Sequence, residues 1–225
     1  MPPHPFMSLR DIGFWIRATK ADYKLASLCR TSDTSQAFDQ LYRAIPDPYG
    51  TTLPYYRYQR LKYERILALL SEKRFQRVLD VGCGLGVMTR MLASRAEQII
   101  GVDVSESALD QARVLSARHA NICYEAGDIA QLVALRQEPF DLIVITDVLY
   151  YLPLTEPLLK SICSSVEALL ATDGLLLLAH HSIFGLDTAS RQTRRIHDCF
   201  ASEVKLEVIR ERWYPFYLIT LLHQL

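Results

Sequence analysis

The sequence predicts an α/β fold in which helices cover both faces of a mostly parallel sheet. From about residue 77, short apolar segments alternate with longer amphipathic ones, which is the pattern of strands connected by helices. The unbroken apolar run 142–145 suits a central parallel strand, because such strands are covered on both faces. Two strand-like segments at the carboxyl end are separated by too few residues for a parallel crossover, so we expect them to pair antiparallel at one edge.

Each element follows from its apolar pattern and its flanking residues. Strands are expected over residues 78–81, 98–102, 121–125, 142–145, 175–179, 204–210 and 216–222. Helices are expected over residues 87–94, 105–117, 158–170 and 191–200. Ser105 and Glu106 suit the first turn of the second of these helices, as an N-cap and an acidic residue near the positive end of the helix dipole.

Residues 1–76 differ in character from residues 77–225, which we expect to form one compact sheet domain. Two helices are expected, over 37–44 and 60–70, with a proline-rich segment at 46–54 between them. The region is rich in tyrosine and predicts a helical unit, either a cap packed on the sheet edge or a lid that closes on ligands. Residues 1–6 read as a tail, so Met7 is an alternative start.

Composition restricts the classes of partner. The 225 residues carry 25 basic and 25 acidic side chains, and a nucleic-acid-binding protein would show a basic excess. No apolar run approaches the length of a membrane span, and the amino terminus lacks the features of a secretory signal. The five scattered cysteines have no metal-ligand or disulfide spacing. We expect a cytoplasmic protein that acts on a small molecule without nucleic acid, membrane or metal; its oligomeric state is open.

The segment 78–86 carries the chemistry. A strand runs into a loop with Gly82, Gly84 and Gly86 and then into a helix, so that backbone N–H groups face a ligand. Asp103 ends the next strand, 17 residues after Gly86, where it is placed to hold a ribose diol. The spacing differs from the dinucleotide fingerprint G-x-G-x-x-G, and Asp80 before the loop suits an ammonium group better than a pyrophosphate. S-adenosylmethionine (SAM) has such an ammonium group.

These motifs resemble those of class I SAM-dependent methyltransferases. Segment 80–86 resembles motif I, 101–105 the post-I motif, 127–129 the adenine-contacting loop, 140–144 the fourth-strand motif and 170–177 the strand-five motif. The resemblance implies a Rossmann-like seven-stranded methyltransferase sheet with SAM as cofactor. The cofactor-binding residues it implies are Asp80, Gly82, Gly84, Gly86, Asp103, Val104, Asp128, Ile129 and Thr146.

A narrower resemblance is to the nodulation protein S family, whose members N-methylate the amino sugar of a chitooligosaccharide signal. It rests on segments 38–42, 46–49 and 58–63 and on 146–152 after the fourth strand. The chain has Asp147 where that family tends to carry Glu, and Arg57 where an aromatic residue is expected. The resemblance implies methyl transfer to an amine or amino-sugar nitrogen.

The candidate acceptor site lies beyond strands four and five, at the edge where open α/β sheets bind ligands. Asp147, His180 and His181 are the candidate catalytic residues, each able to take a proton from an amine. Strand alternation sends adjacent histidines to opposite faces, so one of the pair should face the pocket. Tyr58, Tyr150 and Tyr151 are the candidate substrate-contacting residues. Structural alternatives are a helix N-cap or a turn for Asp147, core packing for Tyr150 and Tyr151, and a structural role for a histidine of the pair.

Three other functions compete with N-methylation. The first is O-methylation of a hydroxylated metabolite, which the same cofactor site would serve. The second is an inactive SAM-binding regulator, which would bind the cofactor without transfer to any acceptor. The third is a nicotinamide dehydrogenase, which tight SAM binding without NAD binding would exclude.

Overall fold

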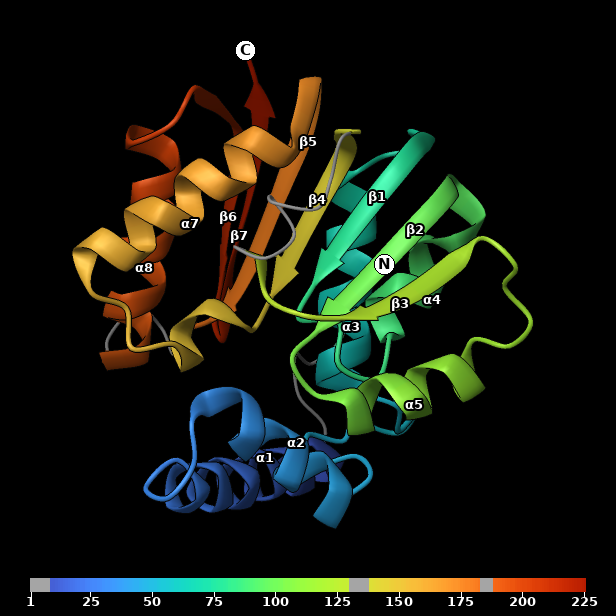
Figure 1. The fold of residues 1–225 in the computed structure, drawn as a ribbon, viewed down its shortest axis with the longest axis vertical. Helices are drawn as coiled ribbons and strands as arrows, with labels where there is room; N and C mark the ends of the chain where they lie inside the picture. Colours follow the sequence, from blue (N-terminus) through green and yellow to red (C-terminus); the bar gives the residue numbers. More distant parts are fainter. Residues whose placement is uncertain (1–8, 130–137, 183–187) are drawn as a thin grey trace.

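A computed structural model describes residues 9–129, 138–182 and 188–225, and its centre is a seven-stranded sheet (Figure 1). The strand order is β3-β2-β1-β4-β5-β7-β6, with β7 antiparallel to both β5 and β6 and the other pairs parallel. The predicted fold class and the antiparallel carboxyl-terminal hairpin are therefore confirmed. The strands are β1 Phe75–Val81, β2 Ala96–Asp103, β3 Ile122–Ala126, β4 Phe140–Thr146, β5 Leu170–His181, β6 Leu206–Tyr214 and β7 Tyr217–Gln224.

The helices agree with the expected positions to within a few residues, with one addition. They are α1 Leu9–Leu28, α2 Thr34–Ala44, α3 Arg57–Leu69, α4 Val87–Leu92, α5 Glu106–Leu115, α7 Glu156–Leu169 and α8 Thr188–Ser202. The addition is α1, 20 residues long, which lies in a part of the chain where no helix was predicted. Ser105 caps α5 as expected, its hydroxyl oxygen accepting from the N–H of Ala108.

The central strands are buried on both faces, and their alternation builds two hydrophobic cores. Leu79, Ile143 and Leu176 point to the face that α7 and α8 cover, while Val78, Leu142 and Leu175 point to the face that α3 and α4 cover. This explains the continuous apolar runs in the sequence, because a strand with helices on both sides has no polar face.

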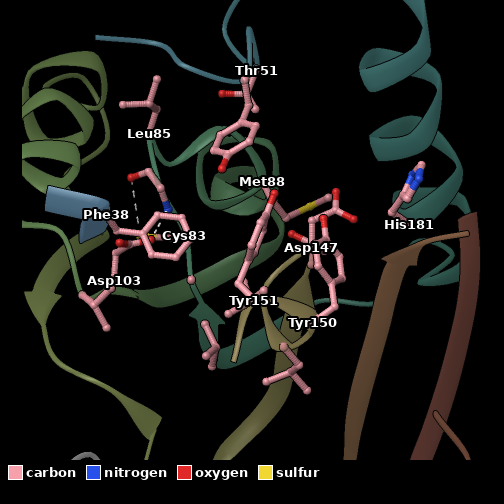
Figure 2. Close-up of a pocket in the computed structure, with 18 of the residues that line it drawn as sticks. Phe38, Thr51, Cys83, Leu85, Met88, Asp103, Asp147, Tyr150, Tyr151 and His181 are labelled. Carbon is pink, nitrogen blue, oxygen red and sulfur yellow. Dashed lines mark hydrogen bonds between the residues drawn. The ribbon is translucent and has the colours of Figure 1, made fainter. Parts of the chain in front are cut away.

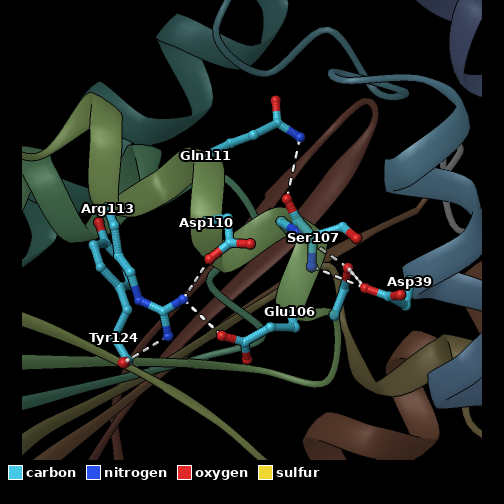
Figure 3. A network of polar contacts seen from close by, with 9 residues as sticks. Asp39, Glu106, Ser107, Asp110, Gln111, Arg113 and Tyr124 are labelled. Carbon is cyan, nitrogen blue, oxygen red and sulfur yellow. Dashed lines mark hydrogen bonds and ion pairs between the residues drawn. The ribbon is translucent and has the colours of Figure 1, made fainter.

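The amino-terminal helices lie across the carboxyl ends of the parallel strands, with α1 and α2 below the sheet in Figure 1. One polar contact that fixes α2 runs to the start of α5 (Figure 3). Asp39 on α2 accepts from the N–H of Ser107 at 2.8 Å and from the hydroxyl of Ser105 at 3.2 Å. A carboxylate at a helix N-terminus meets both free N–H groups and the positive end of the helix dipole. This contact holds α2 over the site.

In the described part of the chain, none of the helices combines the length and the apolar character that crossing a bilayer requires.

Candidate active site

A cavity of about 680 Å³ lies where β1, β2 and β4 end and α1, α2 and α3 cross them. The strand ends supply the glycine loop and the acidic residues, and the helices supply aromatic side chains (Figure 2). This is the edge at which open α/β sheets bind ligands. A cavity of this size encloses a molecule of cofactor or metabolite dimensions.

The glycine loop has a backbone that other residues could not follow. Gly82 and Gly86 both have φ of +67°. A Cβ on Gly82 would lie 2.1 Å from Cγ2 of Val148, and one on Gly86 would lie 2.0 Å from the hydroxyl of Tyr124. Both positions therefore need glycine for the dihedral angle and for the space. The turn brings backbone groups of the loop to the cavity wall.

Asp103 organises this loop from the end of β2. Its carboxylate accepts from the N–H of Gly84 at 2.8 Å and from the N–H of Ser105 at 2.9 Å. Burial raises its pKa, while these backbone N–H groups act in the opposite direction. Each carboxylate oxygen keeps a second lone pair, so Asp103 can hold the loop and still accept from a diol in the cavity.

Asp80 is the buried acid of the site. It is fully buried; one oxygen accepts from the hydroxyl of Thr89 at 2.6 Å, and Oδ1 has no hydrogen-bond partner among the described residues. Burial raises its pKa to about 7, with the charge of Asp103 adding to the rise. An unpaired carboxylate oxygen in an apolar surrounding is costly, and a cationic group beside it would remove that cost.

The structure brings together most of the predicted cofactor residues. The cavity wall includes Asp80, Gly82, Gly84, Asp103, Val104, Asp128, Ile129 and Thr146. Gly86 is not among the residues that line it and instead begins α4. The cofactor contact of each residue stays a prediction, while their convergence on one cavity is a property of the fold.

Asp147 lies at the cavity wall directly after β4 and adopts φ of +55°, a left-handed conformation that few non-glycine residues take. Its Oδ2 is paired with the ammonium of Lys62 on α3, a residue whose side chain is 1% exposed. Its Oδ1 is buried and has no partner in the described part of the chain. Backbone strain of this kind gathers at functional sites, so the conformation supports a role beyond a turn.

The two histidines at the end of β5 separate as strand alternation predicts. His181 lines the cavity and packs on the ring of Trp15 at 5.3 Å between centroids. His180 is fully buried and lies outside the cavity lining. Its ring stacks edge to face with that of Tyr150 at 6.0 Å. Of the pair, only His181 reaches the cavity directly.

The three predicted substrate tyrosines all line the cavity. Tyr150 and Tyr151 stack with centroids 4.5 Å apart, close to Asp147 in Figure 2, and the hydroxyl of Tyr151 donates to Asp22 on α1 at 3.1 Å. Tyr58 packs 5.2 Å from Trp15, and its hydroxyl donates to the carbonyl of Phe216 at 3.2 Å. Together the rings form an apolar wall around Asp147.

Two cavity residues, and the lysine that pairs with Asp147 behind the cavity wall, were missed from the sequence. Trp15 and Asp22 lie on helix α1, which was not predicted, and for this reason neither residue was assigned to the site. Lys62 had a readable signal, because it follows Tyr58 and precedes Ile66 by four residues each on the apolar face of α3. A lysine in such a stripe needs a buried partner, and here the partner is Asp147.

The described cavity lining has several acidic side chains and neither lysine nor arginine. The acidic side chains are the five carboxylates of Asp22, Asp80, Asp103, Asp128 and Asp147. Such a wall favours cations, and a cofactor with a sulfonium and an ammonium group matches it in sign. Oδ1 of Asp80, which has no partner among the residues that the structure describes, fits the ammonium group in particular. Within the described ranges, no group of three or more His, Cys, Asp or Glu side chains could hold a metal ion.

The chain is similar to two named groups of methyltransferase-type proteins. The family model described as Nodulation protein S (NodS) matches residues 34–213. Nodulation protein S of Rhizobium tropici is 33% identical over 96 residues, 42% of this chain and 40% of that protein. The ubiquinone biosynthesis O-methyltransferase of Glaesserella parasuis serovar 5 is 29% identical over 153 residues, 64% of this chain and 61% of that enzyme. The matched parts thus span less than two thirds of these relatives.

The fold is shared over a longer stretch. The crystal structure of N-methyltransferase NodS from Bradyrhizobium japonicum WM9, in complex with S-adenosyl-L-homocysteine, superimposes with a TM-score of 0.68. The match covers 92% of this chain and 98% of that one at 21% sequence identity. At this identity the likeness establishes the fold, which is that of class I SAM-dependent methyltransferases.

Proposed function

The chain belongs to the nodulation protein S (NodS) family, and on this basis we propose that it is a SAM-dependent methyltransferase whose acceptor is the nitrogen of a small amine or amino sugar. The acceptor is a small molecule that enters the cavity of about 680 Å³, and neither nucleic acid nor a membrane is a partner. The reaction takes place in the cytoplasm.

One observation carries the choice of acceptor. The described cavity wall has five carboxylates, the imidazole of His181 and neither lysine nor arginine, although the chain as a whole has equal numbers of acidic residues and of lysines and arginines. Asp80, Asp103 and Asp128 account for the cofactor side. Asp22 and Asp147 remain on the aromatic side, where a neutral hydroxylated acceptor would need no negative charge. Lys62 offsets one of these two charges, and an amine, which arrives as a cation, is attracted by the charge that remains.

The cofactor side of the cavity suits SAM. Asp80 would accept from its ammonium group, Asp103 from its ribose, and Asp128 and Ile129 would flank its adenine. When bound, that cofactor supplies a sulfonium-activated methyl group, which a neutral nitrogen lone pair attacks as sulfur takes up the bonding electrons. The chain's own task is to align the acceptor and to exclude water, and alignment supplies much of the acceleration.

On the acceptor side, Asp147 is the residue that makes the nitrogen neutral. An ammonium group has no lone pair, so one proton must leave before attack. Lys62 holds Oδ2 of Asp147, and among the described residues Oδ1 has no partner. Oδ1 therefore accepts from the acceptor's N–H. Trp15, Tyr58 and Tyr150 enclose the amine with apolar rings, which also face a cation favourably.

A panel of matched acceptors tests the proposal. Each amine, including simple amino sugars, is paired with the alcohol that has a hydroxyl in place of the amino group, and labelled methyl transfer from SAM is measured. We expect transfer to amines and none to their paired alcohols. Transfer to the alcohols alone would make the chain an O-methyltransferase. Tight binding of S-adenosylhomocysteine with no transfer to any acceptor would make it a binding protein without this activity.

A further inference from the structure

Behind Asp147, four side chains from four different elements form a continuous hydrogen-bonded chain. Nδ1 of His180 (β5) is 3.0 Å from Nε2 of His197 (α8), and Nδ1 of His197 is 2.7 Å from the hydroxyl of Thr220 (β7). That hydroxyl donates to Oε2 of Glu211 (β6) at 3.2 Å. His180, His197 and Thr220 are at most 1% exposed. We call these four residues the polar chain.

The donor and the acceptor in each hydrogen bond of the polar chain follow from the carboxylate at its outer end. The single proton of Thr220 goes to the Glu211 carboxylate, so the Thr220 oxygen must accept from His197, whose Nδ1 then carries hydrogen. A neutral His197 has a bare Nε2, which must accept from Nδ1–H of His180. A neutral His180 therefore presents a bare Nε2 at the inner end, and this atom is buried without a partner among the described residues.

Both rings are held neutral by their surroundings. Burial lowers the pKa of His180 to about 4; the charge of Asp147 opposes this effect, and that of Lys62 adds to it. Burial lowers the pKa of His197 well below its usual range, with the neighbouring ring of His180 and the charge of Arg194 adding to it. At neutral pH the polar chain therefore carries the tautomers deduced above.

The inner end of the polar chain lies next to Asp147. The backbone N–H of Asp147 donates to the carbonyl of Ala179 at 2.9 Å, so Asp147 follows β4 beside the residue that precedes His180. Asp147 and His180 each have a buried acceptor atom without a donor in the described chain. The charge of Asp147 acts on the His180 ring, so the two side chains lie near each other, but no hydrogen bond joins these two atoms within the described chain. A proton passes between them only through a water molecule that contacts both.

The outer end reaches the surface. Glu211 is 27% exposed in its side chain and is paired with Arg194 at 2.8 Å. Arg194 also pairs with Asp198, so the carboxylate at the exit is fixed in place while remaining in contact with water. A chain with a carboxylate at the solvent end and a bare imidazole nitrogen at the site end is oriented to conduct protons outward.

We propose that the polar chain is the proton outlet of the site, an inference that rests on the proposed transfer to an amine. The acceptor's ammonium loses one proton to Asp147, which passes it through a bridging water molecule to Nε2 of His180. The Nδ1 proton of His180 then moves to Nε2 of His197, and the Nδ1 proton of His197 moves to the hydroxyl oxygen of Thr220. The hydroxyl proton of Thr220 moves to Glu211, which releases one proton to water. One proton enters and one leaves, and ring rotation restores the tautomers. His197, Thr220 and Glu211 are positioning residues that act through His180 and Asp147.

The first arm of the test needs no acceptor. Imidazole ¹⁵N spectra of the free protein distinguish a protonated from a bare ring nitrogen in each histidine. We expect both His180 and His197 to carry hydrogen on Nδ1 and to stay neutral across pH 6 to 8. In Thr220→Val, which keeps the shape but removes the hydroxyl, His197 should lose this fixed tautomer, and Thr220→Ser should retain it. Hydrogen on Nε2 of His180 in the wild type would overturn the proposal.

The second arm measures turnover of an amine accepted by the wild type. Glu211→Gln should lower kcat by about tenfold or more, less than the roughly 10²–10⁴-fold of a directly acting base, with the acceptor KM unchanged. Glu207→Gln is the matched control, because Glu207 lies exposed on the same strand outside the polar chain. Thr220→Val should lose kcat similarly and Thr220→Ser should restore it.

The two arms separate the two proposals. If no amine is methylated, the proposed function fails, while the ¹⁵N spectra still decide whether the polar chain has the orientation that an outlet needs. If amines are methylated and Glu211→Gln behaves like Glu207→Gln, the outlet is refuted and the proposed function stands.

Discussion

Three aspartates of the cavity wall differ in their hydrogen-bond donors, and these donors determine what each carboxylate can bind. Asp103 accepts from two backbone N–H groups and fixes a loop. Among the described residues, Asp80 has one hydroxyl donor and one oxygen without a partner, which can accept from a cation. Oδ2 of Asp147 is paired with Lys62, and its Oδ1 has no partner in the same part of the chain. The sequence located all three residues, because each lies at or next to the carboxyl end of a strand, but their donors became visible only in the fold.

The raised pKa of Asp80 predicts that cofactor affinity depends on pH. In the free protein Asp80 loses its proton near pH 7, and a bound ammonium group favours the ionised form. Below pH 7 binding must expel that proton, so affinity should rise about tenfold per pH unit up to 7 and level off above. Calorimetry with S-adenosylhomocysteine between pH 5.5 and 8.5 measures this. Asp80→Asn should bind weakly with little pH dependence; an unchanged slope in that variant would assign the effect to another group.

The Lys62–Asp147 pair predicts a non-additive stability cycle. Lys62→Met leaves Asp147 without its buried cation and should cost about 1–3 kcal/mol, since a charge that loses its buried partner is poorly solvated. Adding Asp147→Asn should recover most of that free energy of unfolding, while turnover stays lost in both single variants and in the double variant. Urea denaturation provides the numbers. If the losses in the free energy of unfolding of the two single variants add up to the loss in the double variant, the side chains of Lys62 and Asp147 do not stabilise each other.

At the scale of elements, the strands were predictable and one helix was not. The buried runs around 142–145 and 175–179 are apolar on both faces and could hardly be anything else in an α/β chain. Helix α1 has apolar residues on both sides, with Phe14 and Leu25 buried but Ile12 and Ile16 exposed, so it shows no clear stripe. The aromatic half of the site depends on α1, and for this reason it was only partly foreseen.

The contact of Asp39 on α2 with the start of α5 predicts that its removal destabilises the first turn of α5. Asp39→Ala removes the acceptor of the Ser107 N–H and should cost roughly 1 kcal/mol, with faster hydrogen exchange in the first turn of α5. Asp33→Ala is the matched control, because Asp33 caps α2 itself through the N–H of Gln36. It should speed exchange in α2 alone. Equal exchange at α5 in both variants would show that Asp39 does not hold these helices together.

At the scale of the whole molecule, the neutral net charge hides a strongly acidic cavity. Of the 25 lysines and arginines, none of the described ones lines the cavity, and Lys62 is buried behind Asp147. The sequence predicts the acidic strand ends but cannot show that cationic residues are kept away from them. That separation arises from the packing of α1 to α3 against the sheet, which joins residues far apart in the chain.

The site of methylation on a bifunctional acceptor tests the central claim most directly. An amino sugar such as glucosamine offers one amino group and several hydroxyls to the same cavity, so differences in binding cannot decide the outcome. Incubation with SAM labelled with ¹³C in its methyl group, followed by NMR of the product, shows which atom receives the methyl group. The acidic cavity predicts a new N-methyl signal and no O-methyl signal. An O-methyl product, with the amino group untouched, would contradict the account.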